Sequence, residues 1–121
     1  PLFLKIKNMH FKAIILLTRA DGASHDDFAQ WWLQQHSPLA KQLPGLRRGV
    51  FNLVENPADG DPDGVSELWF DSQSDFEAAY ASEIGKSVVA DSLANVSGRR
   101  RMFVVENVIP RRRCDEGPGS C

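Results

Sequence analysis

His36 is the side chain of this sequence best suited to proton transfer at neutral pH, because an imidazole has a reference pKa of ~6.5. It lies on a predicted helix whose apolar residues recur at three- and four-residue steps and share one side with the histidine. These residues are Phe28, Trp31, Trp32 and Leu39. A buried imidazole needs a partner, since an unpaired donor or acceptor costs about 1–3 kcal/mol. Two interpretations remain open: a catalytic acid or base, or a core histidine bonded to a carbonyl near Pro38.

Glu67 and Asn52, both on predicted strands, are further catalytic candidates. Burial of Glu67 would raise its pKa and suit a proton shuttle. The alternative is a carboxylate that is ion-paired with Lys12 or Arg48. Asn52 has an amide that could donate a hydrogen bond to a substrate carbonyl or a developing enolate.

Aromatic and cationic side chains are candidates for substrate binding. Trp32, Trp69 and Tyr80 could form the wall of a pocket for a flat ligand, although core packing is the alternative for each ring. Arg48, next to a glycine, could hold a carboxylate, and the alternative there is a solvated strand end. Lys12 completes the predicted binding residues.

Composition and motifs exclude several classes of function. The net charge of −2 and the absence of aromatic residues among the arginines of the runs 99–101 and 111–113 argue against a nucleic-acid partner. The sequence has no apolar stretch near the ~20 residues that cross a bilayer and no signal-peptide pattern, so we expect a cytoplasmic protein without a membrane partner. It has no phosphate loop, nucleophile elbow or zinc-type ligand spacing, so we expect no metal and no cofactor.

The order of predicted elements is strand, helix, strand, strand, helix pair, strand. Ser24 with Asp27 marks the start of the first helix, and Pro38 bends or restarts it. The second helix opens near Ser72, and a further helix follows Gly85. The strands are expected at residues 11–18, 46–55, 65–70 and 102–109.

This order predicts an α+β protein of the ferredoxin-like type, β-α-β-β-α-β, with an antiparallel four-stranded sheet. The domain is expected at residues 11–109, between an N-terminal extension at 1–10 and a flexible tail at 110–121. The strands are apolar on both faces, for example at Ile14 and Ile15, while single-striped helices can cover only one face. We therefore expect a homodimer in which the sheet of a second copy covers the other face.

Two blocks of the sequence resemble the EthD-domain family. The first is WLQQHSPL at residues 32–39, followed by LPGLRR at residues 43–48, and the second is ELWFDS at residues 67–72. The similarity spans roughly residues 11–108. It implies a dimeric α+β barrel, in a superfamily that also holds methylmuconolactone isomerases and antibiotic-biosynthesis monooxygenases, and His36 matches the family's histidine position. The family is named after an ether-degradation gene cluster.

Residues and resemblance together favour a cofactor-independent enzyme of small-molecule catabolism or secondary metabolism. Its reaction would be an isomerisation, a decarboxylation or an oxygenation of a small cyclic or aromatic carbonyl compound. In this hypothesis His36 transfers the proton while Glu67 or Asn52 polarises the oxygen. The alternative is a non-catalytic protein that binds a small hydrophobic or aromatic ligand in the same barrel cavity.

Overall fold

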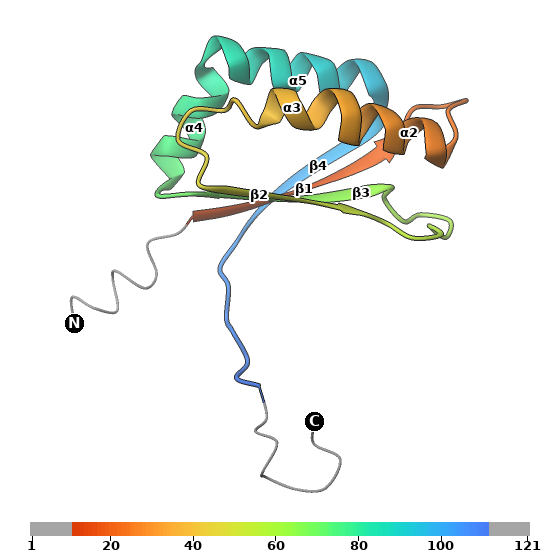
Figure 1. Cartoon of the computed structure of the whole chain (residues 1–121). Helices are drawn as coiled ribbons and strands as arrows, with labels where there is room; N and C mark the ends of the chain where they lie inside the picture. Colours follow the sequence, from red (N-terminus) through yellow and green to blue (C-terminus); the bar gives the residue numbers. More distant parts are fainter. Residues whose placement is uncertain (1–10, 112–121) are drawn as a thin grey trace, which may run out of the picture.

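The computed structural model describes residues 11–111 and has the expected strand–helix–strand–strand–helix–strand order. Four strands form one antiparallel sheet in the order β2-β3-β1-β4. The helices lie on one face of this sheet (Figure 1). The predicted α+β class and ferredoxin-like arrangement are confirmed, and the sheet of one chain is open, with β2 and β4 at its edges. The strands are β1 Phe11–Arg19, β2 Arg48–Leu53, β3 Gly64–Phe70 and β4 Val96–Val104.

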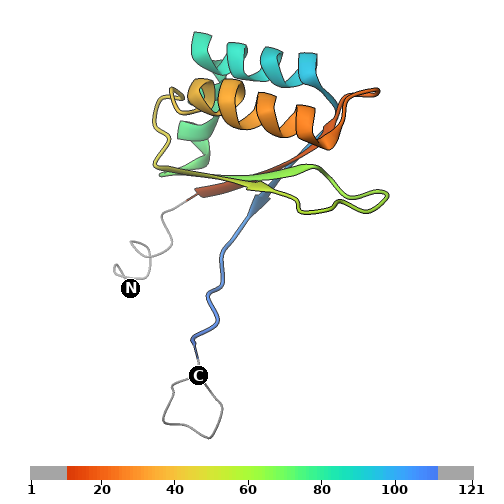
Figure 2. The ribbon, with the colours of Figure 1, turned by 45° about the vertical axis from the view of Figure 1, so that its right-hand side comes forward.

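Two groups of helices form the second layer, and Figure 2 shows them side by side above the sheet. The first group is a continuous run of three segments, and the second is a pair that joins β3 to β4. The first group comprises α2 (His25–Trp31), the π-helical segment η1 (Trp32–His36) and α3 (Ser37–Ala40), and the second comprises α4 (Gln73–Ala81) and α5 (Glu83–Asn95).

Ser24 and Pro38 control where the first helical run begins and where its winding changes. The Ser24 hydroxyl accepts a hydrogen bond from the Asp27 N–H, and the Asp27 carboxylate accepts one from the Ser24 N–H, so the predicted cap is present. Before Pro38, the Ser37 N–H bonds to the Trp32 carbonyl five residues back, which widens the turn. Pro38 has no N–H and sits in the first turn of α3, so of the two predicted outcomes, a bend or a restart, the structure shows a restart.

A glycine in β3 sets how closely the first helical run approaches the sheet. A Cβ on Gly64 would lie 2.6 Å from the Trp32 ring, closer than atoms can pack. Glycine at this position therefore lets Trp32, which is fully buried, lie directly against β3. The surrounding core between sheet and helices includes Ala13, Leu17, Phe28, Phe70, Phe76 and Ala79.

The last strand differs from the sequence prediction. It runs from Val96 to Val104, whereas the apolar run suggested residues 102–109. β4 pairs with β1, and Val104 already lies opposite Lys12 near the start of β1, so later residues have no described strand beside them. Val105, which follows, is 83% exposed. The correction matters because it places the arginine run 99–101 inside the sheet.

Two other boundaries are corrected. β2 is shorter than the predicted strand at residues 46–55, since Leu46 packs against the core instead of pairing. α5 begins at Glu83 and contains Gly85, whose missing Cβ allows close contact with the Ala79 carbonyl. Leu93, later on the same helix, is 64% exposed.

No helix within residues 11–111 covers the second face of the sheet (Figures 1 and 2). Its apolar side chains are only partly buried, which agrees with the predicted apolar pattern on both faces: Ile14, Leu16, Val50, Val65, Met102 and Val104. Within residues 11–111, no helix is long and apolar enough to span a bilayer. The predicted extension at 1–10 and all but the first two residues of the predicted tail at 110–121 lie outside the described range.

Candidate active site

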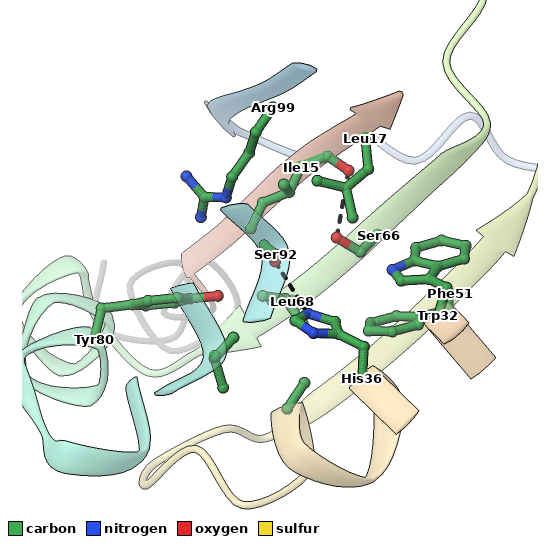
Figure 3. Close-up of a pocket in the computed structure, with 12 residues that line it drawn as sticks. Ile15, Leu17, Trp32, His36, Phe51, Ser66, Leu68, Tyr80, Ser92 and Arg99 are labelled. Atoms are coloured by element: carbon green, nitrogen blue, oxygen red, sulfur yellow. Dashed lines mark hydrogen bonds between the residues drawn. The ribbon is translucent and has the colours of Figure 1, made fainter. Parts of the chain in front are cut away.

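A narrow pocket lies between the helices and the helix-covered face of the sheet (Figure 3). Its free volume is about 10 Å³, roughly enough for one water molecule. Most of its wall is apolar. The polar side chains that reach it are Trp32, His36, Ser66, Tyr80, Ser92 and Arg99.

His36 is buried in this pocket and both ring nitrogens have partners on α5. Nδ1 lies 2.8 Å from Oδ2 of Asp91, and Nε2 lies 3.3 Å from Oγ of Ser92. An ionised carboxylate only accepts hydrogen bonds, so the neutral imidazole carries its proton on Nδ1. Nε2 is then the acceptor, and the Ser92 hydroxyl donates to it. This arrangement leaves the basic nitrogen on the side of the ring that faces Ser92 and the pocket.

Asp91 is held in place by other donors. The Trp31 indole N–H bonds to Oδ2 at 3.2 Å, and the Asn95 amide bonds to Oδ1 at 3.3 Å. These donors hold the Asp91 carboxylate in one position, which fixes the orientation and tautomer of His36. The structural alternative from the sequence, a bond from His36 to a carbonyl near Pro38, is not what the structure contains: the partner of His36 is Asp91.

The pKa of His36 is lowered from its ordinary value, chiefly because burial disfavours the charged imidazolium. The hydrogen bond and negative charge of Asp91 act in the opposite direction but do not outweigh burial. The positive charge of Arg99 lowers the pKa further. His36 is therefore mostly neutral near pH 7, which is the state required of a base.

Trp32 lines the pocket with an unused donor. Its indole Nε1 is buried and has no hydrogen-bond partner among residues 11–111. The ring stacks on Phe51, with centroids 4.4 Å apart and planes at 12°. Figure 3 shows the indole nitrogen on the edge of the ring that faces Ser66 and His36.

Tyr80 and Arg99 lie together at the other end of the pocket in Figure 3. Burial raises the pKa of the Tyr80 hydroxyl, while the charge of Arg99 and a hydrogen bond to it act to lower that pKa. Tyr80 and Arg99 line the same pocket as His36.

The remaining predicted site residues lie on the open face of the sheet. Lys12 Nζ forms an ion pair with Glu67 Oε1 at 2.7 Å, and the Asn52 amide bonds to Glu67 Oε2 at 2.9 Å. Lys12 and Arg48 both lie over the Trp69 ring, 4.5 and 4.7 Å from its centroid. Hydrogen bonds from Lys12 and Asn52 outweigh the effect of burial and lower the pKa of Glu67, so the structure contains the alternative interpretation, a carboxylate that is ion-paired with Lys12.

The predicted site residues thus fall into two groups. His36, Trp32 and Tyr80 share the pocket, whereas Glu67, Asn52, Trp69, Lys12 and Arg48 lie on the opposite face of the sheet. The expected cooperation of His36 with Glu67 or Asn52 is therefore not present, because side chains alternate across a strand and these two point away from the pocket.

The sequence interpretation did not include Asp91, Ser92 or Arg99. Asp91 and Ser92 follow Val88 by three and four residues, a spacing that places both near the buried side of α5. Arg99 was hidden by the misplaced last strand. Within residues 11–111, no group of three or more His, Cys, Asp or Glu residues is arranged to hold a metal ion.

Comparisons with known proteins give relatives of low identity. An uncharacterised 11.0 kDa protein of the thcB–thcC intergenic region of Rhodococcus erythropolis is 28% identical over 107 residues, which cover 84% of this chain and 100% of that protein. A solved ethyl tert-butyl ether (EthD) family protein from Bacillus halodurans matches with a TM-score of 0.69 at 20% identity, over 82% of this chain and 100% of the other.

Two further solved structures share the fold. A dimeric ferredoxin-like protein of unknown function from Thermobifida fusca has a TM-score of 0.67 at 19% identity, over 83% and 93% of the two chains. The hydroxynitrile lyase of Passiflora edulis has a TM-score of 0.66 at 15% identity, over 85% and 99%. The family model of the EthD domain matches residues 20–97. This match covers more than half of the sequence, and the chain belongs to the EthD family.

Proposed function

We propose that this protein is an enzyme that needs no cofactor for its proton-transfer step and acts on a small cyclic or aromatic carbonyl compound. The observation that carries the proposal is the Asp91–His36 pair, whose contact of 2.8 Å directs the basic nitrogen of a buried, neutral imidazole toward the pocket. A positioned base of this kind contributes about 10²–10⁴ in rate. Structural relatives at 15% identity support the fold alone, so the reaction is argued from His36.

The simplest step for this site is proton abstraction from carbon. When the Ser92 hydroxyl turns away from Nε2, His36 takes the proton from a carbon next to a carbonyl, and the electron pair of the broken C–H bond moves to the carbonyl oxygen to give an enolate. The imidazolium is stabilised by Asp91 and returns the proton to the same carbon or to another one. An isomerisation or an exchange with solvent balances without any other reactant.

Space for a substrate depends on Phe51. This half-buried ring lies on the edge strand β2 and belongs to the walls of both the inner pocket and an outer hollow. The outer hollow has a volume of about 280 Å³, close to the lower limit of ~300 Å³ for small-molecule sites. A rotation of Phe51 away from Trp32 would join the two spaces.

Hydrogen–deuterium exchange at carbon tests the proposal with a panel of compounds in place of a single substrate. Lactones, cyclic ketones and aromatic keto acids are incubated with the protein in D₂O near neutral pH, and loss of the C–H signals is followed by NMR. We expect at least one class to exchange faster than without protein. His36→Gln should lower that rate by about 10²–10⁴ while the variant remains folded.

His25→Gln is the matched control. His25 Nδ1 also lies 2.8 Å from a carboxylate, that of Asp63, but His25 does not line the pocket. It should leave the exchange rate unchanged. If no compound exchanges faster although ligands bind, the non-catalytic binding protein is the better account. If His36→Gln exchanges as fast as the original protein, His36 is not the base.

Ser92, His36 and Asp91 also stand in the order of a Ser–His–Asp triad, which favours acyl transfer as a second candidate. Against it, Ser92 lies within α5, where the neighbouring N–H groups are bonded inside the helix, so no backbone pair beside it can bind an oxyanion. A fluorophosphonate probe distinguishes the two candidates: labelling that disappears in Ser92→Ala would favour the acyl-transfer enzyme.

We also propose that two chains associate through the open face of the sheet. The partly buried apolar residues of that face support this arrangement, as does the description of the Thermobifida fusca relative as dimeric. The charged cluster of Lys12 and Glu67 would be enclosed there as a paired group, the form in which buried charges are tolerated.

A further inference from the structure

Two polar groups of the pocket are not used by the proton-transfer proposal. Among the described residues the Trp32 indole N–H has no partner, and the half-buried Arg99 guanidinium lines the pocket beside the Tyr80 hydroxyl without an ion pair. An unpaired buried donor is destabilising, and a guanidinium at the wall of a mostly apolar pocket is stabilised when an anion joins it. Both groups therefore call for a ligand that supplies oxygen atoms.

The position of Arg99 distinguishes it from its neighbours in β4. It lies opposite Leu17 of β1, and Leu17 is buried on the helix-covered face. Arg100 lies opposite Leu16, on the open face. Arg101 is on the same face as Arg99, but its guanidinium lies 4.4 Å from the centroid of the Phe103 ring. Arg99 is thus the arginine of this run that lines the pocket.

Tyr80 adds a second donor at the same end of the pocket. Figure 3 shows its hydroxyl directed toward the centre, on the side where the Arg99 guanidinium lies. Burial keeps the Tyr80 hydroxyl protonated, since its pKa is raised. A guanidinium and a neutral hydroxyl side by side form a receptor for a carboxylate or phenolate oxygen.

We propose that the substrate is a small organic anion with two separate oxygen functions, an anionic oxygen bound by Arg99 and Tyr80 and a carbonyl oxygen that accepts the Trp32 indole N–H. An aryl keto acid and a hydroxylated aromatic ketone both have this pattern. The inference rests on the proposed function for the carbon that reacts at His36. It moves the carboxylate contact that the sequence suggested for Arg48, which lies on the open face, to Arg99 in the pocket.

The Trp32 contact would also serve the reaction. The negative charge of an enolate builds up on the former carbonyl oxygen, and a fixed N–H in a pocket without bulk water stabilises it more than the neutral ketone. The indole lies directly against Gly64, a contact that a rotation of Phe51 leaves in place, so the donor is positioned when the substrate arrives.

Binding of a matched pair of compounds tests the inference without any need for turnover. Benzoylformate is compared with its uncharged methyl ester by NMR titration of the whole chain. We expect the acid to bind about 10- to 100-fold more tightly, the range for a charge-assisted hydrogen bond. The Trp32 indole N–H signal should shift on binding, while that of Trp69 on the open face should not.

Arg99→Gln should remove the preference for the acid, and Arg100→Gln, on the open face of the same strand, should keep it. Trp32→Phe preserves a stacking ring but removes the unpaired N–H. We expect it to lower the melting temperature, because the smaller ring leaves a cavity against Gly64, and in addition to weaken binding of the acid. A ring with a purely structural role would lower the melting temperature to a similar extent without a specific effect on binding by the folded protein.

The inference is overturned if the ester binds as tightly as the acid, if Arg99→Gln and Arg100→Gln behave alike, or if no aryl or alkyl carboxylate of a panel binds at millimolar concentration. The proposed function fails separately. If the protein prefers acids but catalyses no exchange at carbon, the proposed enzyme activity is refuted and the anion site is retained. If only uncharged ketones exchange, the anion site is refuted and the enzyme activity is retained.

Discussion

The two faces of the sheet differ in how completely their polar side chains are hydrogen-bonded. On the open face, Lys12, Glu67 and Asn52 satisfy one another at distances of 2.7 and 2.9 Å. On the helix-covered face, the Trp32 N–H has no hydrogen-bond partner among residues 11–111, and the basic nitrogen of His36 has a hydroxyl at 3.3 Å as its partner there. Polar side chains that hydrogen-bond to one another have no free donor or acceptor to offer. Polar side chains in an enclosed pocket whose hydrogen bonds are incomplete can bind a ligand. This difference supports the proposal that the chemistry takes place on the covered face.

The electrostatics of the two faces follow the same division. Partners on the open face move the pKa values of Lys12 and Glu67 toward the charged forms, upward for the lysine and downward for the glutamate. In the pocket, burial dominates and moves the pKa of His36 toward the neutral form. The charged pair of Lys12 and Glu67 suits a structural role, in the fold or between two chains. The neutral imidazole of His36 suits proton transfer.

The largest expected contrast is between Asp91→Asn and Glu67→Gln. An asparagine amide can donate to His36 Nδ1, which moves the imidazole proton to Nε2 and removes the base. We expect turnover to fall by about 10²–10⁴ with a smaller loss of stability. Glu67→Gln breaks the Lys12 ion pair and should change stability while turnover per folded molecule stays within about twofold. Equal losses of turnover in the two variants would contradict the division between the faces.

A charge on the open face provides the second test. Ile14→Asp places an unpaired carboxylate among the partly buried apolar residues of that face. We expect the dissociation constant of the dimer to rise by about 30-fold or more, roughly 2 kcal/mol, in sedimentation equilibrium. Leu93→Asp, at an exposed position of α5, is the control and should leave association unchanged. A wild-type protein that sediments as a monomer at micromolar concentration would refute the interface.

The smallest effect is the dependence of stability on pH. The folded pKa of His36 is lowered, so protonation favours the unfolded chain and stability falls as the pH drops below 6.5. The folded pKa of Glu67 is also lowered, so its contribution is present above pH 4.5 and is lost as the pH falls further. Melting curves of His36→Gln should therefore approach those of the original protein between pH 7 and 5, and those of Glu67→Gln should do so only below about pH 4.5. The reverse order would contradict the assignments.

More of the fold than of the candidate site could be predicted from the sequence. Alternating apolar residues and the capping pattern of Ser24 were sufficient for the element order. The end of β4 could not be predicted, because it depends on the length of β1, a partner distant in sequence. For the same reason Arg99 could not be placed in the pocket, and the pairing of His36 with Asp91, 55 residues later, required the packing of η1 against α5. Local periodicity indicated that His36 faces inward but not what it contacts.

The nitrogen chemical shifts of the His36 imidazole, followed by NMR between about pH 5 and pH 8, test the central claim most directly and need no substrate. The account predicts a ring that is neutral at pH 7, with its proton on Nδ1 toward Asp91 and a titration midpoint below 6.5. In Asp91→Asn the proton should move to Nε2. A ring that is charged at pH 7, or one that carries its proton on Nε2 in the original protein, would contradict a base directed into the pocket.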